Sequence, residues 1–289
     1  MTDDGAAKIQ VGTRLGSGLT VLGIVDDRGD EPVYLVWHHE SWCPMLCKVL
    51  RSKEAAQREA DILLAVTHPN IVRCFGVSGL TCLLMEYLEG PSLHQIVKRR
   101  PKRQLGINDA LRLSIYVGAA LSHVHDRGLL HLDVKPANIV VANGRPILCD
   151  FGIARRQAAA RPNGMRGTEG YVAPEECLLE EITPAADVFG LGVTLYELLT
   201  GHMPFAKKTD AEPYPQILRP PSSVRQHRAT VPVGLEKLVL SCLNRDPKAR
   251  PTLPTLLPSL HQFISSGPPM WPTGFHPEIQ TDERRKRTT

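Results

Sequence analysis

The sequence predicts an α+β fold in two lobes, with a small β-rich N-terminal lobe that carries one helix and a larger, mainly helical C-terminal lobe. Three observations predict it. Residues 9–50 alternate Val, Ile, Tyr and Trp with Gly and Asp, as strands and turns do. Helical periodicity dominates after Gly90-Pro91. Residues 187–199 are apolar on almost every face, which is typical of a helix buried inside a larger domain.

The first lobe is expected to continue beyond residue 50 with a helix and two strands. Ser52 can cap a helix over residues 53–66, because its hydroxyl can accept a bond from a free N–H of the first turn. Apolar runs at 71–76 and 82–87 then predict two strands. We therefore assign residues 9–86 to the N-terminal lobe.

The second lobe is expected to span residues 87–264. Asn108 can cap a helix that carries a row of apolar side chains on one face. That row consists of Leu113, Val117, Leu121 and Val124. A β-rich lobe followed by a helical one predicts a cleft at the joint, near residues 86–90, and clefts between lobes are where ligands bind.

Two terminal tails flank the lobes. Residues 1–8 are polar and lack the apolar segment of a signal peptide. Residues 265–289 are rich in Pro and then basic, so we expect them to lack a core of their own and to be flexible. The basic runs at 98–103 and 284–287 are interpreted as solvated; an acidic partner or a membrane surface is the alternative.

Composition narrows the classes of protein further. The chain has 289 residues, 42% of them hydrophobic, and a net charge of +4, which is too small to indicate nucleic-acid binding. Its longest apolar stretch, 188–199, is too short for a membrane span and carries Glu197. The seven cysteines are an odd number and favour reduced thiols over a disulfide framework. These features predict a cytoplasmic protein.

The chemistry is concentrated in two short motifs. The first is His131-Leu132-Asp133-Val134-Lys135-Pro136-Ala137-Asn138, and the second is Asp150-Phe151-Gly152. Phosphoryl transfer from ATP needs a carboxylate to receive the proton of the attacking hydroxyl and oxygen ligands to hold magnesium against the phosphates. Asp133 is placed for the first task. Asn138 and Asp150 are placed for the second.

Lys48 is a single cation in the apolar run 45–49. A buried lysine without a partner loses its proton, so a carboxylate is required. Glu59 is the better candidate, because it shares one helix face with Leu63 and Val66. Glu54 lies near the exposed start of the same helix and is the alternative.

These motifs resemble the catalytic loop and the magnesium loop of protein kinases, most closely those of the eukaryotic-type Ser/Thr kinases of bacteria. The resemblance covers residues 9–264. It implies a protein-kinase-like fold, ATP and Mg²⁺ as cofactors, and a Lys48–Glu59 pair that holds the nucleotide phosphates.

The resemblance also assigns residues to the nucleotide. Gly16-Ser17-Gly18 is the candidate phosphate loop, since glycines let backbone N–H groups approach a phosphate. Val21 stands where a third glycine is expected and Gly23 where a valine normally covers the adenine. The nucleotide-binding residues predicted in addition to Lys48 and Glu59 are Leu15, Gly16, Gly18, Gly23, the gatekeeper Met85, and Glu86 and Leu88 of the hinge, whose backbone groups would meet the adenine edge.

Specificity is indicated by further matches to the family. Ser/Thr kinases carry a lysine two residues after the base, here Lys135, and a threonine that steadies both, here Thr168. Residues 173–175, Ala-Pro-Glu, and their partner Arg250 are absent from small-molecule phosphotransferases. The resemblance therefore implies transfer to Ser/Thr hydroxyls of a protein substrate; it does not specify an oligomeric state.

The resemblance also bears on regulation. Leu132 replaces the arginine that grips a phosphate on the activation segment in many kinases. Residues 150–175 offer only Thr168 and Tyr171 as hydroxyls, and the motif already uses both. We expect activity without phosphorylation of this segment. Two rivals stay open: a pseudokinase that senses nucleotide or acts as a scaffold, and a small-molecule phosphotransferase.

Overall fold

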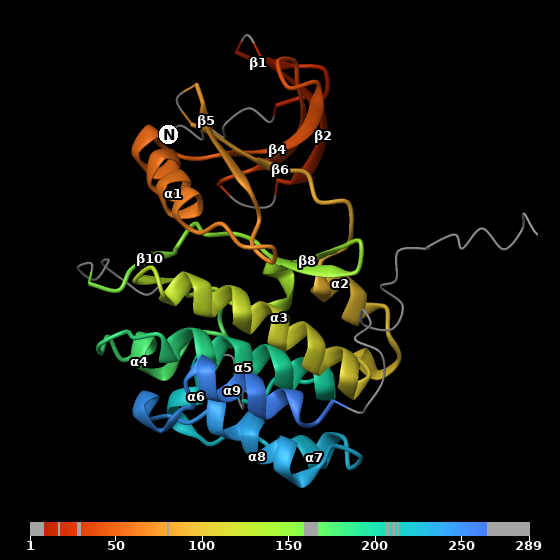
Figure 1. Ribbon diagram of the computed structural model, residues 1–289, viewed down its shortest axis with the longest axis vertical. Coiled ribbons are helices and arrows are strands. Elements are labelled where there is room, and N and C mark those ends of the chain that lie inside the picture. Colours follow the sequence, from red (N-terminus) through yellow and green to blue (C-terminus); the bar gives the residue numbers. More distant parts are fainter. Residues whose placement is uncertain are drawn as a thin grey trace, which may run out of the picture.

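The computed structural model describes residues 9–16, 18–27, 30–79, 81–158, 167–205, 209, 212 and 214–264. Two lobes are stacked along its long axis, with the sheet in one and most helices in the other (Figure 1). The α+β prediction is confirmed. The predicted tails at 1–8 and 265–289 lie outside the described residues.

The N-terminal lobe is an antiparallel sheet with the strand order β1-β2-β3-β4-β6-β5. Its strands are β1 (Arg14–Leu15), β2 (Leu19–Asp26), β3 (Val33–His38), β4 (Cys43–Val49), β5 (Cys74–Ser78) and β6 (Cys82–Glu86). Helix α1 (Lys53–Ala65) packs against β5 and β6 (Figure 1). Ser52 caps it as predicted, since its Oγ accepts a hydrogen bond of 3.2 Å from the Ala55 N–H.

One predicted strand of this lobe is displaced. The apolar run at 71–76 predicts a strand, but β5 begins only at Cys74. Ile71 instead forms an isolated parallel bridge with Leu148 of the other lobe. Pairing with that lobe takes Ile71 away from the N-terminal sheet.

The C-terminal lobe is mainly helical. Its helices are α2 (Leu93–Lys98), α3 (Ile107–His125), α4 (Pro174–Cys177), α5 (Ala185–Thr200), α6 (Pro215–Leu218), α7 (Val224–His227), α8 (Val233–Cys242) and α9 (Leu253–His261). Two small ladders, β7 (Leu129–Leu130) with β10 (Arg155–Arg156) and β8 (Ile139–Ala142) with β9 (Arg145–Leu148), lie at its upper surface. The predicted cap of α3 is wrong: Gly106 is the N-cap residue and Asn108 lies inside the first turn.

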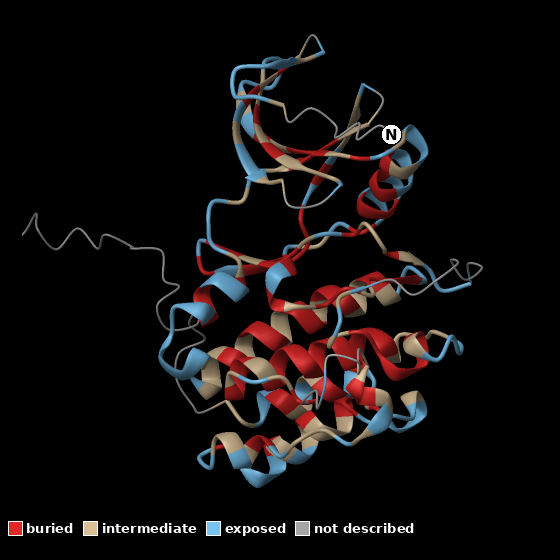
Figure 2. Ribbon diagram, turned by 180° about the vertical axis from the view of Figure 1, so that it is seen from behind, coloured by how far each residue is buried: buried red, intermediate tan, exposed pale blue. Residues whose placement is uncertain are grey.

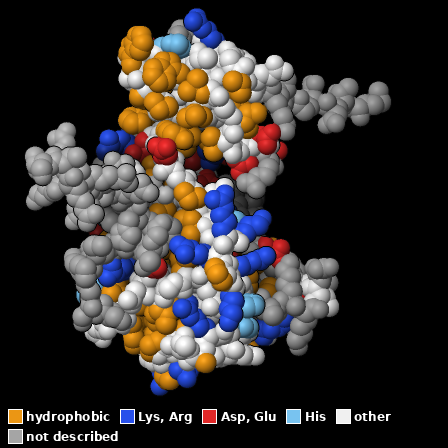
Figure 3. Space-filling view, turned by 90° about the vertical axis from the view of Figure 1, so that its right-hand side faces the viewer, with side chains coloured by type: hydrophobic (Ala, Val, Ile, Leu, Met, Phe, Trp, Pro, Cys, Tyr) orange, Lys and Arg blue, Asp and Glu red, His pale blue; other side chains and the backbone are white. Residues whose placement is uncertain are grey.

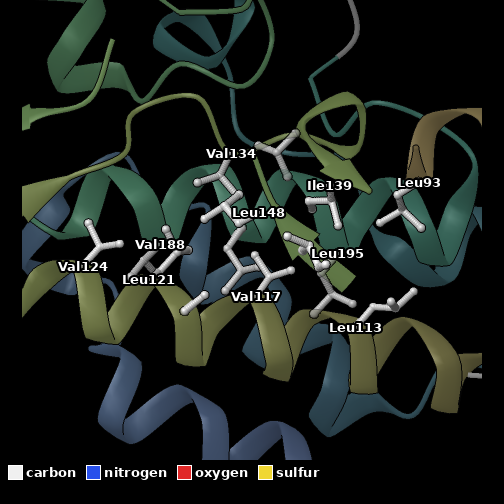
Figure 4. Close-up of a cluster of buried hydrophobic side chains, with 14 of the residues drawn as sticks. Leu93, Leu113, Val117, Leu121, Val124, Val134, Ile139, Leu148, Val188 and Leu195 are labelled. Atoms are coloured by element: carbon white, nitrogen blue, oxygen red, sulfur yellow. The ribbon is translucent and has the colours of Figure 1, made fainter. Parts of the chain in front are cut away.

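The core of this lobe lies between α3 and α5. Leu113, Val117, Leu121 and Val124 are buried on one face of α3, as predicted. They meet α5 and the β8–β9 hairpin in Figure 4. Almost all of α5 is buried (Figure 2). No helix among the described ranges is both long and apolar enough to cross a bilayer.

Candidate active site

A cavity of about 950 Å³ lies between the two lobes. Strands β2, β3, β4 and β6 of the first lobe and the loops that flank β8 and β9 in the second lobe supply its wall. Seven of the predicted site residues line it: Lys48, Glu59, Met85, Leu88, Asp133, Asn138 and Asp150. Residues from separate parts of the chain thus face one space of the size of a nucleotide site.

The Asp133 carboxylate is held from three directions. Thr168 Oγ1 donates to its Oδ1 at 2.8 Å, and Lys135 Nζ and Asn138 Nδ2 donate to its Oδ2 at 2.6 Å and 2.7 Å. Lys135 also donates to the Thr168 hydroxyl. A carboxylate has about four lone-pair positions, so these three bonds leave one on Oδ1 for a further donor.

Asp187 of α5 braces the loop that carries Asp133. Its Oδ2 accepts from the His131 N–H at 2.9 Å and its Oδ1 from the Leu132 N–H at 2.7 Å, while Leu132 adopts the left-handed region at φ 66°. Burial alone favours the neutral acid, but the hydrogen bond and charge of His125 outweigh it and lower the pKa of Asp187. A buried anion thus fixes the backbone beside the catalytic loop.

The His131 ring links the two motifs. It packs edge-on against Phe151 with ring centroids 4.6 Å apart. The Asp133 N–H donates to its Nδ1 at 3.2 Å, so Nε2 carries the proton and donates to the Cys149 carbonyl at 3.2 Å. This ring positions the two loops against each other and leaves the carboxylate of Asp133 as the reactive group.

Lys48 is the cation of the upper wall. Its Nζ donates to both Glu59 oxygens at 3.0 Å and to Asp150 Oδ1 at 3.2 Å, and it lies 3.4 Å from Glu31 Oε2. Burial lowers the pKa of Lys48, but attraction by Asp150, Glu59 and Glu31 outweighs it, so the net pKa is raised. The predicted Lys48–Glu59 pair is confirmed, and Glu54 is not the partner.

The pKa of Asp150 is lowered, whereas that of Lys48 is raised. Desolvation by itself raises the pKa of its carboxyl, but the nearby charge and hydrogen bond of Lys48 lower it overall. Asp150 is therefore ionised, at a left-handed φ of 61° that turns the chain directly before Phe151. The Asp150 carboxylate and the Asn138 amide line the same cavity and together offer oxygen donors, which are the kind that Mg²⁺ prefers.

A second buried ion pair ties the segment after the catalytic loop to the body. Arg250 donates to both oxygens of Glu175 at 2.7 Å, and the two side chains are 0% and 1% exposed. The guanidinium also lies 5.0 Å from the ring centroid of Phe189. The predicted partnership of Arg250 with Glu175 is confirmed.

Glu176, the neighbour of Glu175, yields a prediction about pH. Burial raises the pKa of its carboxyl to about 8, although the Ala173 N–H donates to its Oε1 at 3.1 Å. A carboxyl whose pKa is higher in the folded chain than in the unfolded chain stabilises the fold when it is protonated. This stabilisation is complete below the unfolded pKa and is lost as the pH rises through about 8. We expect Glu176→Gln to be more stable than the parent at pH 8.5, on the order of a few kcal/mol.

Urea unfolding between pH 4 and 8.5 checks this expectation. The advantage of Glu176→Gln should shrink towards pH 4, where both side chains are neutral. Glu180→Gln, at an exposed position four residues along, is the matched control. A difference between Glu176→Gln and the parent that does not change with pH would contradict the prediction.

The hinge residues are placed in part as predicted. Met85 and Leu88 line the cavity, together with Tyr87, while Glu86 is not among the lining residues. The Glu86 side chain turns away and accepts a 2.8 Å hydrogen bond from the Arg73 N–H. Of the predicted hinge residues, the apolar Met85 and Leu88 therefore line the cavity and the charged Glu86 does not.

The predicted phosphate loop requires a correction. Leu15, Gly16, Gly18 and Gly23 do not line the cavity. Gly16 and Gly18 lie at the turn between β1 and β2, and Gly23 lies within β2, paired with Leu35. Lys48 lies on β4, and β4 pairs with β3, so the hairpin that covers the cavity is β2–β3. Gly16 and Gly18 belong to the hairpin before it, and Gly23 lies inside the first strand of the covering hairpin, away from its turn.

Acidic residues, not the predicted glycines, line the cavity at the hairpin that covers it. Of the described residues of the β2–β3 hairpin, those that line the cavity are Val25, Asp26, Asp30, Glu31 and Val33. Sequence reasoning missed all five. Counting strands back from Lys48, instead of searching for glycines, would have found them.

Comparison with known proteins gives the family. Residues 32–263 match the protein kinase domain family. The serine/threonine-protein kinase PkaA of Streptomyces coelicolor is 37% identical over 209 residues, which are 69% of this chain and 38% of PkaA. The kinase pkn2 of Myxococcus xanthus is 30% identical over 280 residues, or 88% of this chain and 32% of pkn2.

A solved structure agrees with these sequence matches. The crystal structure of the PknI kinase domain of Mycobacterium tuberculosis superposes with a TM-score of 0.69 and 26% identity, covering 88% of this chain and 99% of that one. This chain spans well under half the length of PkaA and of pkn2. The family match, the two-lobed fold and the cavity geometry together establish that the chain belongs to the protein kinase family.

Proposed function

We propose that this chain is a Ser/Thr protein kinase domain that transfers the γ-phosphate of ATP, with Mg²⁺, to Ser or Thr hydroxyls of a protein. One observation carries the proposal. The Asp133 carboxylate is held by Thr168, Lys135 and Asn138 with one lone pair left on Oδ1, on the wall of a cavity that also exposes Lys48 and Asp150. Such a carboxylate can accept the proton of an attacking hydroxyl.

The other residues fit the remaining tasks. Lys135, bonded to Asp133 and Thr168, places a positive charge where negative charge moves during transfer. Asn138 donates to Asp133 through its amide nitrogen, which leaves the amide oxygen available as a metal ligand in the cavity that Asp150 also lines. Magnesium bound there would neutralise charge on the phosphates.

The buried Glu175–Arg250 pair supports a protein as the acceptor. It anchors the segment that follows Thr168 to the helical lobe, and small-molecule phosphotransferases lack this anchor. Residues 9–86 and 87–264 are proposed as the two lobes. A cytoplasmic location, where ATP is available, is part of the same proposal.

The test incubates the purified chain with γ-labelled ATP, magnesium and a generic protein substrate, beside Asp133→Asn. Label on Ser and Thr of the substrate, dependent on Asp133 and abolished by EDTA, is the expected result. Label only on a small molecule would favour the phosphotransferase reading. Nucleotide binding without any transfer would overturn the proposal.

A second candidate function has a specific observation in its favour. Glu31 lies 3.4 Å from Lys48, where a kinase needs a free cation for phosphates. A module that senses nucleotide or serves as a scaffold without catalysis would tolerate this contact. The same assay separates the two, because such a module binds nucleotide but transfers nothing.

The proposal includes activity without phosphorylation of the activation segment. Thr168 and Tyr171 are the hydroxyl residues of 150–175, and they bond to Asp133 and Glu197 respectively. Leu132, which stands at the position of the phosphate-binding arginine, offers no charge. Residues 159–166 of this segment lie outside the described residues.

Phosphatase treatment provides the corresponding prediction. We expect the treated and untreated chain to transfer phosphate at rates that agree within about twofold, because no charge-assisted bond of the kind worth about 1.5–3 kcal/mol is lost. Mass spectrometry of the chain checks which residues carry phosphate before treatment. Loss of activity together with a phosphate mapped to residues 150–175 would contradict the expectation.

A further inference from the structure

The segment that covers the cavity is anionic where a phosphate-binding loop is expected. Asp26 ends β2, and Asp30 and Glu31 precede β3 at Val33. In Figure 3, acidic side chains gather at the level of the cleft between the lobes. Asp30 also bonds to Arg51 at 2.5 Å, in an exposed ion pair near the end of β4.

Lys48 has no donor left for a phosphate. A lysine ammonium has three N–H donors. Three carboxylates surround the Lys48 Nζ, with Glu59 at 3.0 Å, Asp150 at 3.2 Å and Glu31 at 3.4 Å. Glu59 takes two of the three donors and Asp150 takes the third, while Glu31 approaches the nitrogen as a charge without a hydrogen bond. A nucleotide phosphate can therefore reach this nitrogen only by displacing a carboxylate.

Glu31 is the carboxylate that can leave. The Glu59 side chain is 3% exposed and is held on α1, so its displacement would strand a buried charge. Asp150 is needed as an oxygen ligand for magnesium. Glu31 has the longest of the three contacts and lies on a connection between strands. Its side chain is 30% exposed and makes no hydrogen bond to Lys48, whereas Asp150, at 47% exposed, is hydrogen-bonded to that nitrogen.

The net charge of the cavity wall also opposes the binding of free ATP. Among the residues of the cavity wall that the structure describes, the acidic ones outnumber the basic ones two to one. The acidic set is Asp26, Asp30, Glu31, Glu59, Asp133 and Asp150, and the basic set is Lys48, Arg51 and Arg58. Free ATP therefore meets stronger repulsion than its complex with divalent cations, which carries less negative charge.

We propose that Glu31 is an intramolecular anion that occupies Lys48 in place of the nucleotide phosphates. ATP then binds in competition with Glu31, and divalent cations favour this binding because they reduce the negative charge of ATP. This inference rests on the proposed function, since it assumes that the cavity takes ATP. It makes Glu31 a determinant of nucleotide affinity that acts through Lys48.

The test measures dissociation constants of ATP and of adenosine by calorimetry, in EDTA and in magnesium, for the parent, Glu31→Gln and Glu40→Gln. Both variants remove one negative charge from the N-terminal lobe, but exposed Glu40 is not a cavity residue. In EDTA, Glu31→Gln should bind ATP about tenfold more tightly than the parent, as expected when one charge-assisted contact is released. Adenosine, which has no phosphate, should bind all three equally.

A second measurement needs no variant. In EDTA the parent should bind adenosine at least as tightly as ATP, and magnesium should reverse that order. The inference would be overturned if the parent bound ATP more tightly than adenosine in EDTA. It would also be overturned if Glu31→Gln and Glu40→Gln bound ATP in EDTA with the same dissociation constant. Failure of every variant to bind either ligand would instead overturn the proposed function itself.

Discussion

Asp133→Asn is expected to slow phosphoryl transfer by about 10²–10⁴-fold, the usual contribution of a positioned base. The Asn side chain has the same shape, but it cannot hold the proton of the attacking hydroxyl. Asp133 lines the cavity together with Lys48 and Asp150, and these two would still hold the nucleotide. The loss should therefore appear in kcat, measured with labelled ATP, while the dissociation constant for MgATP changes little.

Asp126→Asn is the matched control for this experiment. Asp126 is exposed at the end of α3 and is not part of the cavity wall, so its loss of charge should leave kcat unchanged. Equal rates for Asp133→Asn and Asp126→Asn would contradict the role of Asp133. A fall in thermal stability of Asp133→Asn without a fall in kcat would assign it a purely structural role.

Arg250→Met is expected to lower the free energy of unfolding by about 3–5 kcal/mol. The substitution leaves Glu175, which is 1% exposed, as a buried charge without its two 2.7 Å bonds. It also leaves the Asn244 and Ala185 carbonyls without the donors that Arg250 supplies. Urea unfolding at neutral pH measures the change.

The control for Arg250 is an ion pair of similar length on the surface. Arg51 lies 2.5 Å from Asp30, but the two side chains are 67% and 75% exposed. Exposed pairs contribute about 0–1 kcal/mol, so Arg51→Met should change the stability by less than about 1 kcal/mol. Similar losses for Arg250→Met and Arg51→Met would show that burial does not set the strength of the Glu175 pair.

The chemical residues were predictable because they act over short stretches of sequence. Asp133, Lys135 and Asn138 lie within six residues, so the loop itself sets their spacing, and the structure bonds all three together. Lys48 and Glu59 were predictable because a buried cation needs an anion and because helical periodicity turns Glu59 inward.

The covering hairpin was not predictable in the same way. Glycine marks a turn locally, whereas the strand that faces the cavity is set by pairing between β3, β4 and β6 across the sheet. Gly16 and Gly18 do mark a turn, but one hairpin too early. Glu31 gave no signal either, because only the fold brings it to 3.4 Å from Lys48.

The measurement that tests the central claim most directly is phosphoamino acid analysis of a protein substrate after incubation with MgATP and either the parent chain or Asp133→Asn. If Asp133, Asn138 and Asp150 serve one transfer site, the parent will leave phosphoserine or phosphothreonine and the variant almost none. Equal labelling by both chains, or no labelling by a parent that binds MgATP, would contradict it.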